Sequence, residues 1–162
     1  PVFEDVYVWL KDNLPPENPA SLLHNDYKLD NVMFQNDDPS NLIAIFDWDM
    51  CTLGDPLVDL GTLLAYWTEK SDPPFYRGLL GMPSADYGFM TRAELTARYT
   101  ERSGHSVKQI RFYHVLALYR LVVIIAQIYI RYHRGQTQDQ RFAEFGKIIP
   151  VIAQNAYDLA IS

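Results

Sequence analysis

Two polar clusters flank a predicted β-hairpin, and this arrangement constrains the fold more than any other feature of the sequence. The clusters are His24-Asn25-Asp26-Tyr27-Lys28-Leu29-Asp30-Asn31 and Asp47-Trp48-Asp49. Between them, Val32 to Phe34 and Leu42 to Phe46 are β-prone runs, and residues 35–41 are rich in turn formers. Because a hairpin brings its two ends together, we expect Asn31 and Asp47 to lie side by side, although 16 positions separate them.

Most of the remaining sequence predicts α-helix, because apolar residues recur there at helical spacing. The predicted helices cover residues 2–13, 57–67, 91–104, 106–134 and 138–160. Capping boxes at Thr91 to Glu94 and at Ser106 to Gln109 are expected to start the third and fourth helices, and Pro150 should kink the last. Residues 70–88, with three prolines and three glycines, should be irregular and either mobile or part of a substrate site. The predicted fold class is α+β, mainly α with one small β-hairpin, in a single domain of 162 residues.

Composition and charge narrow the range of partners and compartments. A net charge of -6 and a pI near 5.1 argue against general binding to nucleic acids or anionic membranes. The single cysteine, Cys51, excludes an internal disulfide, and without a visible secretory signal the predicted location is the cytoplasm. The apolar run Val115 to Ile130 contains Tyr119, Arg120 and Gln127 and falls short of the ~20 apolar residues of a membrane span, so we expect a buried helix.

The residue types of the two clusters suit phosphoryl transfer, which needs a positioned base and oxygen ligands for Mg²⁺. Asp26 is the candidate general base for a substrate hydroxyl. Asn31 and Asp47 offer hard oxygen ligands for Mg²⁺, and Asp49 is a candidate for a second ion or a metal-bound water. Lys28 could neutralise negative charge on the moving phosphoryl group.

Two further residues are expected to support this site without taking part in the chemistry. His24 should hold the loop in place by hydrogen bonding and transfer no proton. Asp55 suits the N-cap of the helix predicted from residue 57, with Pro56 at its first position.

The two clusters resemble the motifs of a known family. His24 to Asn31 is similar to the kinase catalytic loop. Asp47-Trp48-Asp49, followed by Gly54 to Leu60, resembles the branch of aminoglycoside phosphotransferases and choline kinases, in which Asp-Trp-acid takes the place of Asp-Phe-Gly. Within that branch the chain is most similar to the phosphotransferase domain related to that of acyl-CoA dehydrogenase fusion proteins, and Phe112-Tyr113 and residues 131–137 also fit this subgroup.

This resemblance implies the C-terminal lobe of a protein-kinase-like fold, with ATP and Mg²⁺ as co-substrates and a small-molecule alcohol as acceptor. In the fusion-protein subgroup the acceptor would be a hydroxyacyl-CoA, and in other branches an aminoglycoside, choline or a sugar. By matched position, Asp26 would be the base, and Asn31 and Asp47 would be magnesium ligands. Asp55 and Asp59 would brace the loop and cap the helix that follows.

The N-terminal lobe of such kinases has no counterpart in the sequence. The 22 residues before Leu23 predict one helix and a proline-rich loop, without a nucleotide-covering loop or a strand lysine. We therefore expect the catalytic lobe alone, with the nucleotide-gripping lobe absent and little or no kinase activity by itself. The face that meets the missing lobe would be apolar and could drive self-association.

Two other interpretations of the motifs stay open. Asp47 and Asp49 after a β-prone run also resemble the nucleophile and acid of a haloacid-dehalogenase-type phosphatase, with Gly54 to Asp59 as its later acidic motif. The close spacing of these motifs, and the lack of a βαβ pattern after them, count against a phosphatase. The other alternative is a non-catalytic interaction module derived from a kinase.

The acceptor cannot be identified from the sequence. Residues 70–88 and 129–136 are the best candidates to line its site. Arg131 and Arg134 could pair with an acidic acceptor, or they could serve as cationic partners of a helix dipole.

Overall fold

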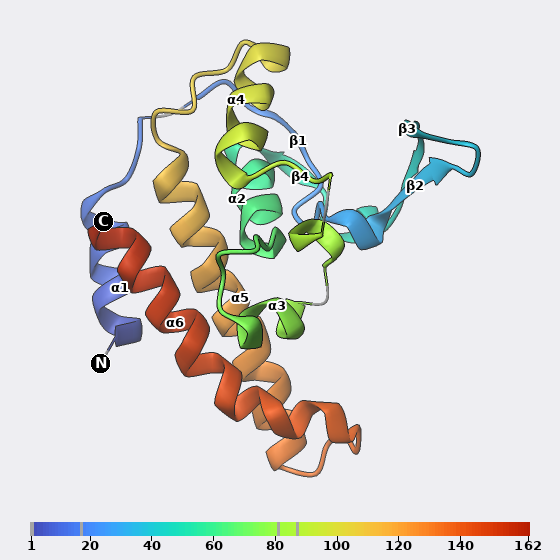
Figure 1. Ribbon diagram of the computed structural model, residues 1–162. Helices are drawn as coiled ribbons and strands as arrows, with labels where there is room; N and C mark the ends of the chain where they lie inside the picture. Colours follow the sequence, from blue (N-terminus) through green and yellow to red (C-terminus); the bar gives the residue numbers. More distant parts are fainter. Residues whose placement is uncertain (1, 17, 81, 87) are drawn as a thin grey trace. The chain divides into compact units, whose positions relative to one another are not determined.

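The computed structural model describes residues 2–16, 18–80, 82–86 and 88–162 (Figure 1). The chain divides into two compact units, one made of residues 1–15 and 111–162 and the other of residues 16–110. Helices dominate both units, and all strands that the structure describes belong to the second unit. The expected fold class, mainly α with a small β region, is confirmed.

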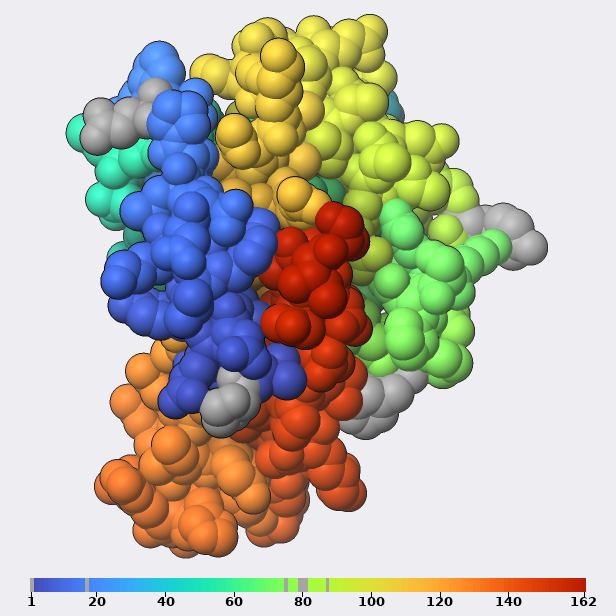
Figure 2. All heavy atoms as spheres, turned by 90° about the vertical axis from the view of Figure 1, so that its left-hand side faces the viewer, coloured from blue at the N-terminus to red at the C-terminus, as the bar shows by residue number. Residues whose placement is uncertain are grey.

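Among the residues that the structure describes, three helices and a short 3₁₀ helix form the first unit. They are α1 (Val2–Asp12), α5 (Ile110–His133), the 3₁₀ helix Gln140–Glu144 and α6 (Phe145–Ile161). α1 lies beside α6, as Figures 1 and 2 both show. The ring of Phe3 on α1 stacks on Tyr119 of α5 with 4.3 Å between the centroids. Val6 and Ile152 are almost completely buried, so α1 and α6 each contribute an apolar face to the core.

The helix α5 is longer than the apolar run that the sequence suggested. It has 24 residues, and by length and composition alone it could cross a membrane. This is a weak indicator, because the core helix of a soluble protein meets the same criteria. Residues on one side of α5 such as Val115 and Leu118 are fully buried, whereas Ile124 and Ile130 are exposed, so the helix is buried in part only.

In the described part of residues 16–110, four strands, three α-helices and three 3₁₀ helices form the second unit. The strands are β1 (Ser21–Leu23), β2 (Val32–Gln35), β3 (Asp38–Ile45) and β4 (Thr52–Gly54). The α-helices are α2 (Leu57–Tyr66), α3 (Pro74–Leu80) and α4 (Arg92–Ser103), and the 3₁₀ helices are Leu29–Asn31, Trp48–Met50 and Pro83–Ala85. The strands pair in two antiparallel two-stranded sheets, β1 with β4 and β2 with β3.

The predicted hairpin is present as β2 and β3. Val32 lies opposite Ile45, and the Phe46 N–H donates to the Asn31 carbonyl at 2.8 Å. Asp47 follows directly, so the hairpin brings the backbones of the two polar clusters side by side as expected.

The turn of this hairpin is shorter than predicted, because β3 begins at Asp38 and only residues 36 and 37 separate the strands. The turn was predicted to be too long because proline at position 39 usually indicates the absence of a strand. In a two-stranded sheet each strand has one open edge, and a proline there removes no ladder hydrogen bond. Register shifts on either side of Phe34 absorb the irregular pairing.

The ladder between β1 and β4 was not predicted, since the sequence suggested loops at both places. Leu23 lies opposite Thr52, and Ser21 lies opposite Gly54. A Cβ on Gly54 would come within 2.8 Å of Leu23 Cδ1, so the absence of a side chain permits this close approach. The ladder brings together the two ends of residues 24–51, the segment that carries both polar clusters.

The helix boundaries agree with the sequence in most places. α1 and α2 end within one residue of their predicted ends, and Thr91 forms the predicted capping box with Glu94. Gly104 ends α4 with a φ of 74°, in the left-handed conformation that glycine adopts easily.

Three helix predictions were wrong in detail. Residues 106–109 form a turn rather than a capping box, and α5 begins at Ile110. Residues 70–88 are not irregular throughout, because α3 and a 3₁₀ helix lie within them. The last helix starts at Phe145 after a separate 3₁₀ turn, although Pro150 does lie inside it.

Candidate active site

The first turn of α2 fixes the start of the loop that carries the first cluster. The backbone N–H groups of His24 and Asn25 donate to Asp59 Oδ2 and Oδ1, each at 2.7 Å. Asn25 has a φ of 65°, which asparagine tolerates better than most residues, and its amide donates to the Met50 carbonyl at 2.9 Å. One carboxylate therefore sets the backbone of two consecutive loop residues.

His24 is buried and connects the loop to the end of β3. Its Nε2–H donates to the Phe46 carbonyl at 2.6 Å, and its Nδ1 accepts the Asp26 N–H at 3.2 Å. These two bonds assign the Nε2–H tautomer, because a carbonyl can only accept and an N–H can only donate. The ring also packs against Trp48 of the second cluster, with 4.8 Å between the centroids. Both ring nitrogens are thus engaged by the backbone.

Asp26 accepts hydrogen bonds from the two other polar residues of the loop. Lys28 Nζ lies 2.9 Å from Oδ1 and 2.7 Å from Oδ2. The Asn31 amide nitrogen donates to the Asp26 carbonyl at 2.8 Å and to Oδ2 at 3.0 Å. Because the nitrogen of the buried Asn31 amide is committed to Asp26, its oxygen is the atom that can serve a cation.

Lys28 lies between Asp26 and an aromatic face. Its Nζ is 5.0 Å from the ring centroid of Tyr66, at the end of α2. Burial by itself lowers the pKa of Lys28, but the hydrogen bond to Asp26 and the charges of Tyr66, Asp26 and Asp30 outweigh it. The net shift raises the pKa of Lys28, so the side chain is an ammonium at neutral pH.

The second cluster lies directly after β3. Asp47 adopts a φ of 62° and a ψ of 58°, and Trp48 begins a short 3₁₀ helix. The indole N–H of Trp48 donates to the Ile45 carbonyl at 2.9 Å. Asp47 and Asp49 are both exposed. Across residues 2–16, 18–80, 82–86 and 88–162, neither carboxylate forms a hydrogen bond or an ion pair with the protein.

The oxygen atoms of Asn31, Asp47 and Asp49 suit Mg²⁺ in their chemistry. No three His, Cys, Asp or Glu side chains gather as a metal site in the part of the chain that the structure describes. Magnesium at a nucleotide site does not need such a group, because it commonly binds one or two carboxylates and takes its other ligands from phosphates and water. The residues present fit an ion that arrives with a nucleotide.

Asp55 lies between the second cluster and α2 in the sequence, and its side chain caps α2. Its Oδ1 accepts the Leu57 N–H at 2.9 Å, and its Oδ2 accepts from the Asn18 amide at 2.7 Å. Pro56 already has helical φ and ψ values of −59° and −22°. The geometry is that of a helix cap with proline at the first helical position.

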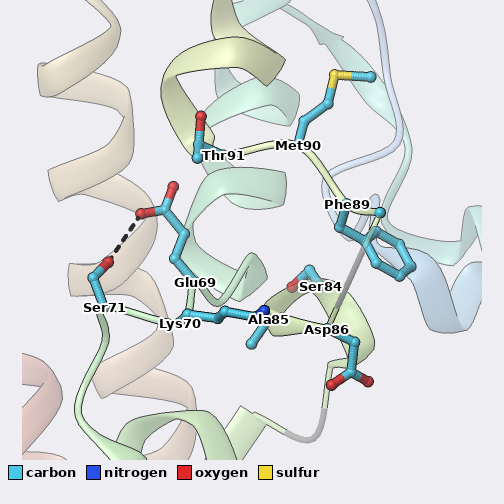
Figure 3. Close-up of a pocket in the computed structure, with 10 residues that line it drawn as sticks. Glu69, Lys70, Ser71, Ser84, Ala85, Asp86, Phe89, Met90 and Thr91 are labelled. Carbon is cyan, nitrogen blue, oxygen red and sulfur yellow. Dashed lines mark hydrogen bonds between the residues drawn. The ribbon is translucent and has the colours of Figure 1, made fainter.

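A pocket of about 360 Å³ lies in the same unit (Figure 3). Its lining residues are Glu69, Lys70, Ser71, Ser84, Ala85, Asp86, Gly88, Phe89, Met90 and Thr91. Ser84 is buried and its hydroxyl accepts the Thr68 N–H at 2.8 Å. Glu69 accepts hydrogen bonds from Ser71 and from the Arg92 N–H, so its carboxylate also caps α4. Most of the lining comes from the segment that the sequence suggested as a substrate site.

The end of α2 connects this pocket to the catalytic loop. Tyr66 contacts Lys28. The next residue, Trp67, donates its indole N–H to the Met90 carbonyl at 2.8 Å, and its ring lies 5.7 Å from that of Phe89. Sequence reasoning missed the contacts of Tyr66 and Trp67, because both residues read as apolar positions of a helix. Nothing local links Tyr66 to Lys28, or Trp67 to Phe89 and Met90.

The fold is that of the kinase-like phosphotransferases. The chain belongs to the phosphotransferase enzyme family, whose model matches residues 1–93. The expected family membership is thereby confirmed.

Relatives of known structure or description agree with this family. The chain is 30% identical to acyl-CoA dehydrogenase family member 10 of Mus musculus and 27% identical to acyl-CoA dehydrogenase family member 11 of Homo sapiens, each over 99% of its length. It spans 15% and 20% of these two proteins. The crystal structure of a putative aminoglycoside phosphotransferase from Ralstonia eutropha JMP134 superposes with a TM-score of 0.83 at 28% identity, over 99% of this chain and 49% of that one.

Proposed function

We propose that this chain carries the base and magnesium ligands of an ATP-dependent kinase that phosphorylates a hydroxyl group of a small molecule. The observation that carries the proposal is the loop in which Asp26, Lys28 and Asn31 are bonded to one another, with Asp47 one residue beyond the hydrogen bond between Asn31 and Phe46. Membership of the phosphotransferase family supports the reaction class.

Each residue has a distinct role in this proposal. As the acceptor oxygen bonds to phosphorus and the bond to the nucleotide breaks, the hydroxyl proton passes to Asp26. Asn31 and Asp47 would hold Mg²⁺, which when bound neutralises charge on the phosphates, and Asp49 would hold a second ion or a metal-bound water. Lys28 would contribute its positive charge to the phosphoryl group.

The pocket beside α2 is our candidate for the acceptor site. The resemblance to the fusion-protein subgroup implies a hydroxyacyl-CoA as acceptor, and the description of the matched structure names an aminoglycoside. The lining offers one ammonium at Lys70, carboxylates at Glu69 and Asp86, and the ring of Phe89. This mixture of charges does not favour either class, and the substrate has to be found by assay.

The phosphatase alternative is not favoured. A phosphatase of that type requires its acidic motifs on neighbouring strands of a parallel sheet. In the part of the chain that the structure describes, the strands pair only antiparallel, and Asp47 follows a hairpin strand. The bonds among His24, Asp26 and Asn31 would also have no role in a phosphatase.

An assay of phosphate transfer from ATP to a panel of alcohols tests the proposal, using this chain alone and the full-length product of its gene. We expect the full-length protein to be active and this chain alone to be close to background, since it spans 49% of the matched structure. Asp26→Asn should lower turnover by roughly 10²–10⁴-fold. Asp37→Asn, on the exposed hairpin turn, is the matched control. Normal turnover of Asp26→Asn would disprove that Asp26 is the general base.

A further inference from the structure

The carboxylate of the proposed base is covered by a neighbouring side chain. Lys28 Nζ binds both oxygens of Asp26, and the Asn31 amide binds one of them as well. A carboxylate has about four lone-pair positions, so these three hydrogen bonds from two donor groups leave little of it open. The side chains of Asp26 and Lys28 are only 23% and 18% exposed, which gives water little access to the pair. An acceptor hydroxyl would therefore meet the ammonium in its approach to the carboxylate.

A second contact determines where the ammonium can go. Nζ of Lys28 lies 5.0 Å from the ring centroid of Tyr66, which is the last residue of α2. A cation is favoured both by the face of an aromatic ring and by the C-terminal end of a helix. Asp59, which binds the backbone at the start of the loop, lies seven positions earlier on the same helix, and a spacing of seven puts two residues on one face. One face of α2 thus holds the loop at both His24 and Lys28.

We propose that Lys28 is a movable cover on Asp26 and that Tyr66 is its positioning residue, so that an arriving phosphoryl anion draws the ammonium away and opens Asp26 to the acceptor hydroxyl. The identity of the anion rests on the proposed function, whereas the cover itself rests on the contacts among these three residues. Tyr66 touches neither substrate nor metal in this scheme and acts only through Lys28.

Simple electrostatics supports this exchange. A terminal phosphoryl group carries more negative charge than one carboxylate, and a lysine head on a flexible four-carbon stem can turn from one to the other. Asn31 cannot follow, because its amide is buried and also bound to the Asp26 carbonyl. The Tyr66 ring keeps the ammonium near the site during the exchange rather than in bulk water. The base would then be available only when a phosphoryl donor is in place.

The experiment follows the carboxyl carbon of Asp26 by NMR in this chain, labelled with ¹³C at the aspartate carboxyls. The Asp26 signal is assigned by its absence from Asp26→Asn. Inorganic pyrophosphate with Mg²⁺ is then titrated in at constant ionic strength. We expect a saturable shift of the Asp26 signal towards the position that it has in Lys28→Met without pyrophosphate. In Lys28→Met the signal should not move further.

Tyr66 variants test the positioning role. Tyr66→Leu should weaken the pyrophosphate response by roughly two- to fivefold, the factor that corresponds to a cation–π contact at a partly exposed site. Tyr66→Phe keeps the ring and should restore the response of the wild type. Tyr7→Leu replaces an exposed tyrosine of the other unit and is the matched control.

Three outcomes would overturn the proposal: no shift of Asp26 at any pyrophosphate concentration, a shift that persists in Lys28→Met, or an unchanged response in Tyr66→Leu. Asp26→Asn and Lys28→Met supply the assignment and the reference position, whereas the response itself is measured in the wild-type chain. The titration is also independent of the kinase assay. An inactive full-length protein whose Asp26 signal still responds would refute the proposed function and leave the cover standing.

Discussion

The loop of residues 24–31 and the acidic turn of residues 47–49 belong to one candidate site but are held in different ways. In the loop, His24 is 3% exposed and Asn31 is 8% exposed, and both side chains are hydrogen-bonded. In the acidic turn, Asp47 and Asp49 are exposed and make no hydrogen bond or ion pair with any residue that the structure describes. The protein itself positions the proposed base, whereas the carboxylates that would bind the metal are left to solvent.

The difference follows from the cost of burying polar groups. A buried polar atom without a partner is destabilising by roughly 1–3 kcal/mol, so the loop can be rigid only if its groups bond to one another. Exposed carboxylates keep their hydration and need no protein partner. The comparison predicts that changes in the loop alter stability and that changes in the acidic turn alter ion binding. Four substitutions test this division, in order of their expected effect on the free energy of unfolding.

The largest effect is expected from Asp59→Ala. It removes the acceptor of two backbone N–H groups, and hydrogen bonds to a charged group contribute about 1.5–3 kcal/mol each when fully formed. Because the carboxylate is partly exposed, we expect a loss of about 3 kcal/mol in the free energy of unfolding. Urea denaturation followed by circular dichroism measures it. Asp37→Ala on the hairpin turn should change stability by less than about 0.5 kcal/mol. Equal stability of the two variants would contradict the bracing role of Asp59.

His24→Ala should lower the free energy of unfolding by about 2 kcal/mol, since the Phe46 carbonyl and the Asp26 N–H both lose a neutral hydrogen-bond partner. The matched control is His133→Ala, which removes an exposed histidine at the end of α5. Amide hydrogen exchange of the Asp26 N–H would show whether the loop itself loosens. Unchanged protection of that amide would mean that the histidine does not link the loop to β3.

Gly54→Ala should lower the free energy of unfolding by about 1 kcal/mol. The added Cβ would meet Leu23 Cδ1, the end of a flexible side chain that can shift at modest cost. Gly78→Ala, in α3 with open space around it, should instead gain about 0.5–1 kcal/mol from helix propensity. Thermal melts of the two variants should therefore move in opposite directions. If Gly54→Ala were stabilising, β1 and β4 would not be closely packed at Leu23 and Gly54.

Asp47→Asn should leave the free energy of unfolding within about 0.5 kcal/mol of the wild type. The side chain has no partner in the described chain, and asparagine tolerates the left-handed conformation of this position. Binding of Mn²⁺ in the presence of a non-hydrolysable ATP analogue should weaken by at least about tenfold, as measured by electron paramagnetic resonance. Asp49→Asn should have the smaller effect on Mn²⁺. If Asp47→Asn were destabilised and still bound Mn²⁺ normally, the acidic turn would contribute to stability and not to ion binding, which would contradict the comparison.

Sequence reasoning worked where the physical signal is local. Periodic apolar residues predicted α1 and α2, and the Thr91 capping box predicted the start of α4. Two β-prone runs with turn formers between them predicted the hairpin. It failed where the signal is weak or competes with another pattern. The three-residue strands of the β1–β4 ladder are too short to show a period, and a plausible capping box at Ser106 lost to a turn.

The candidate site divides in the same manner. The spacing of Asp26, Lys28, Asn31 and Asp47 identified the residues, because a loop and a hairpin place them by local geometry. The resemblance implied that Asp59 braces the loop, and its bonds to the loop backbone agree with that role. The contact of Tyr66 with Lys28 could not be predicted, because it joins residues more than 30 positions apart. Their partners are chosen by the packing of α2 against the loop, which no local pattern encodes.

Spacing along the chain identified the groups proposed for the chemistry: the Asp26 carboxylate, the Asn31 amide, the Lys28 ammonium and the two acidic residues after the hairpin. The contacts of these groups are set by the tertiary structure. It placed the Lys28 ammonium on Asp26, committed the Asn31 nitrogen so that its oxygen is left for a cation, and kept Asp47 in solvent. The physical reason is that a hydrogen bond depends on distances set by distant helices and on the cost of leaving a buried polar atom unpaired, and neither quantity can be obtained from spacing along the chain.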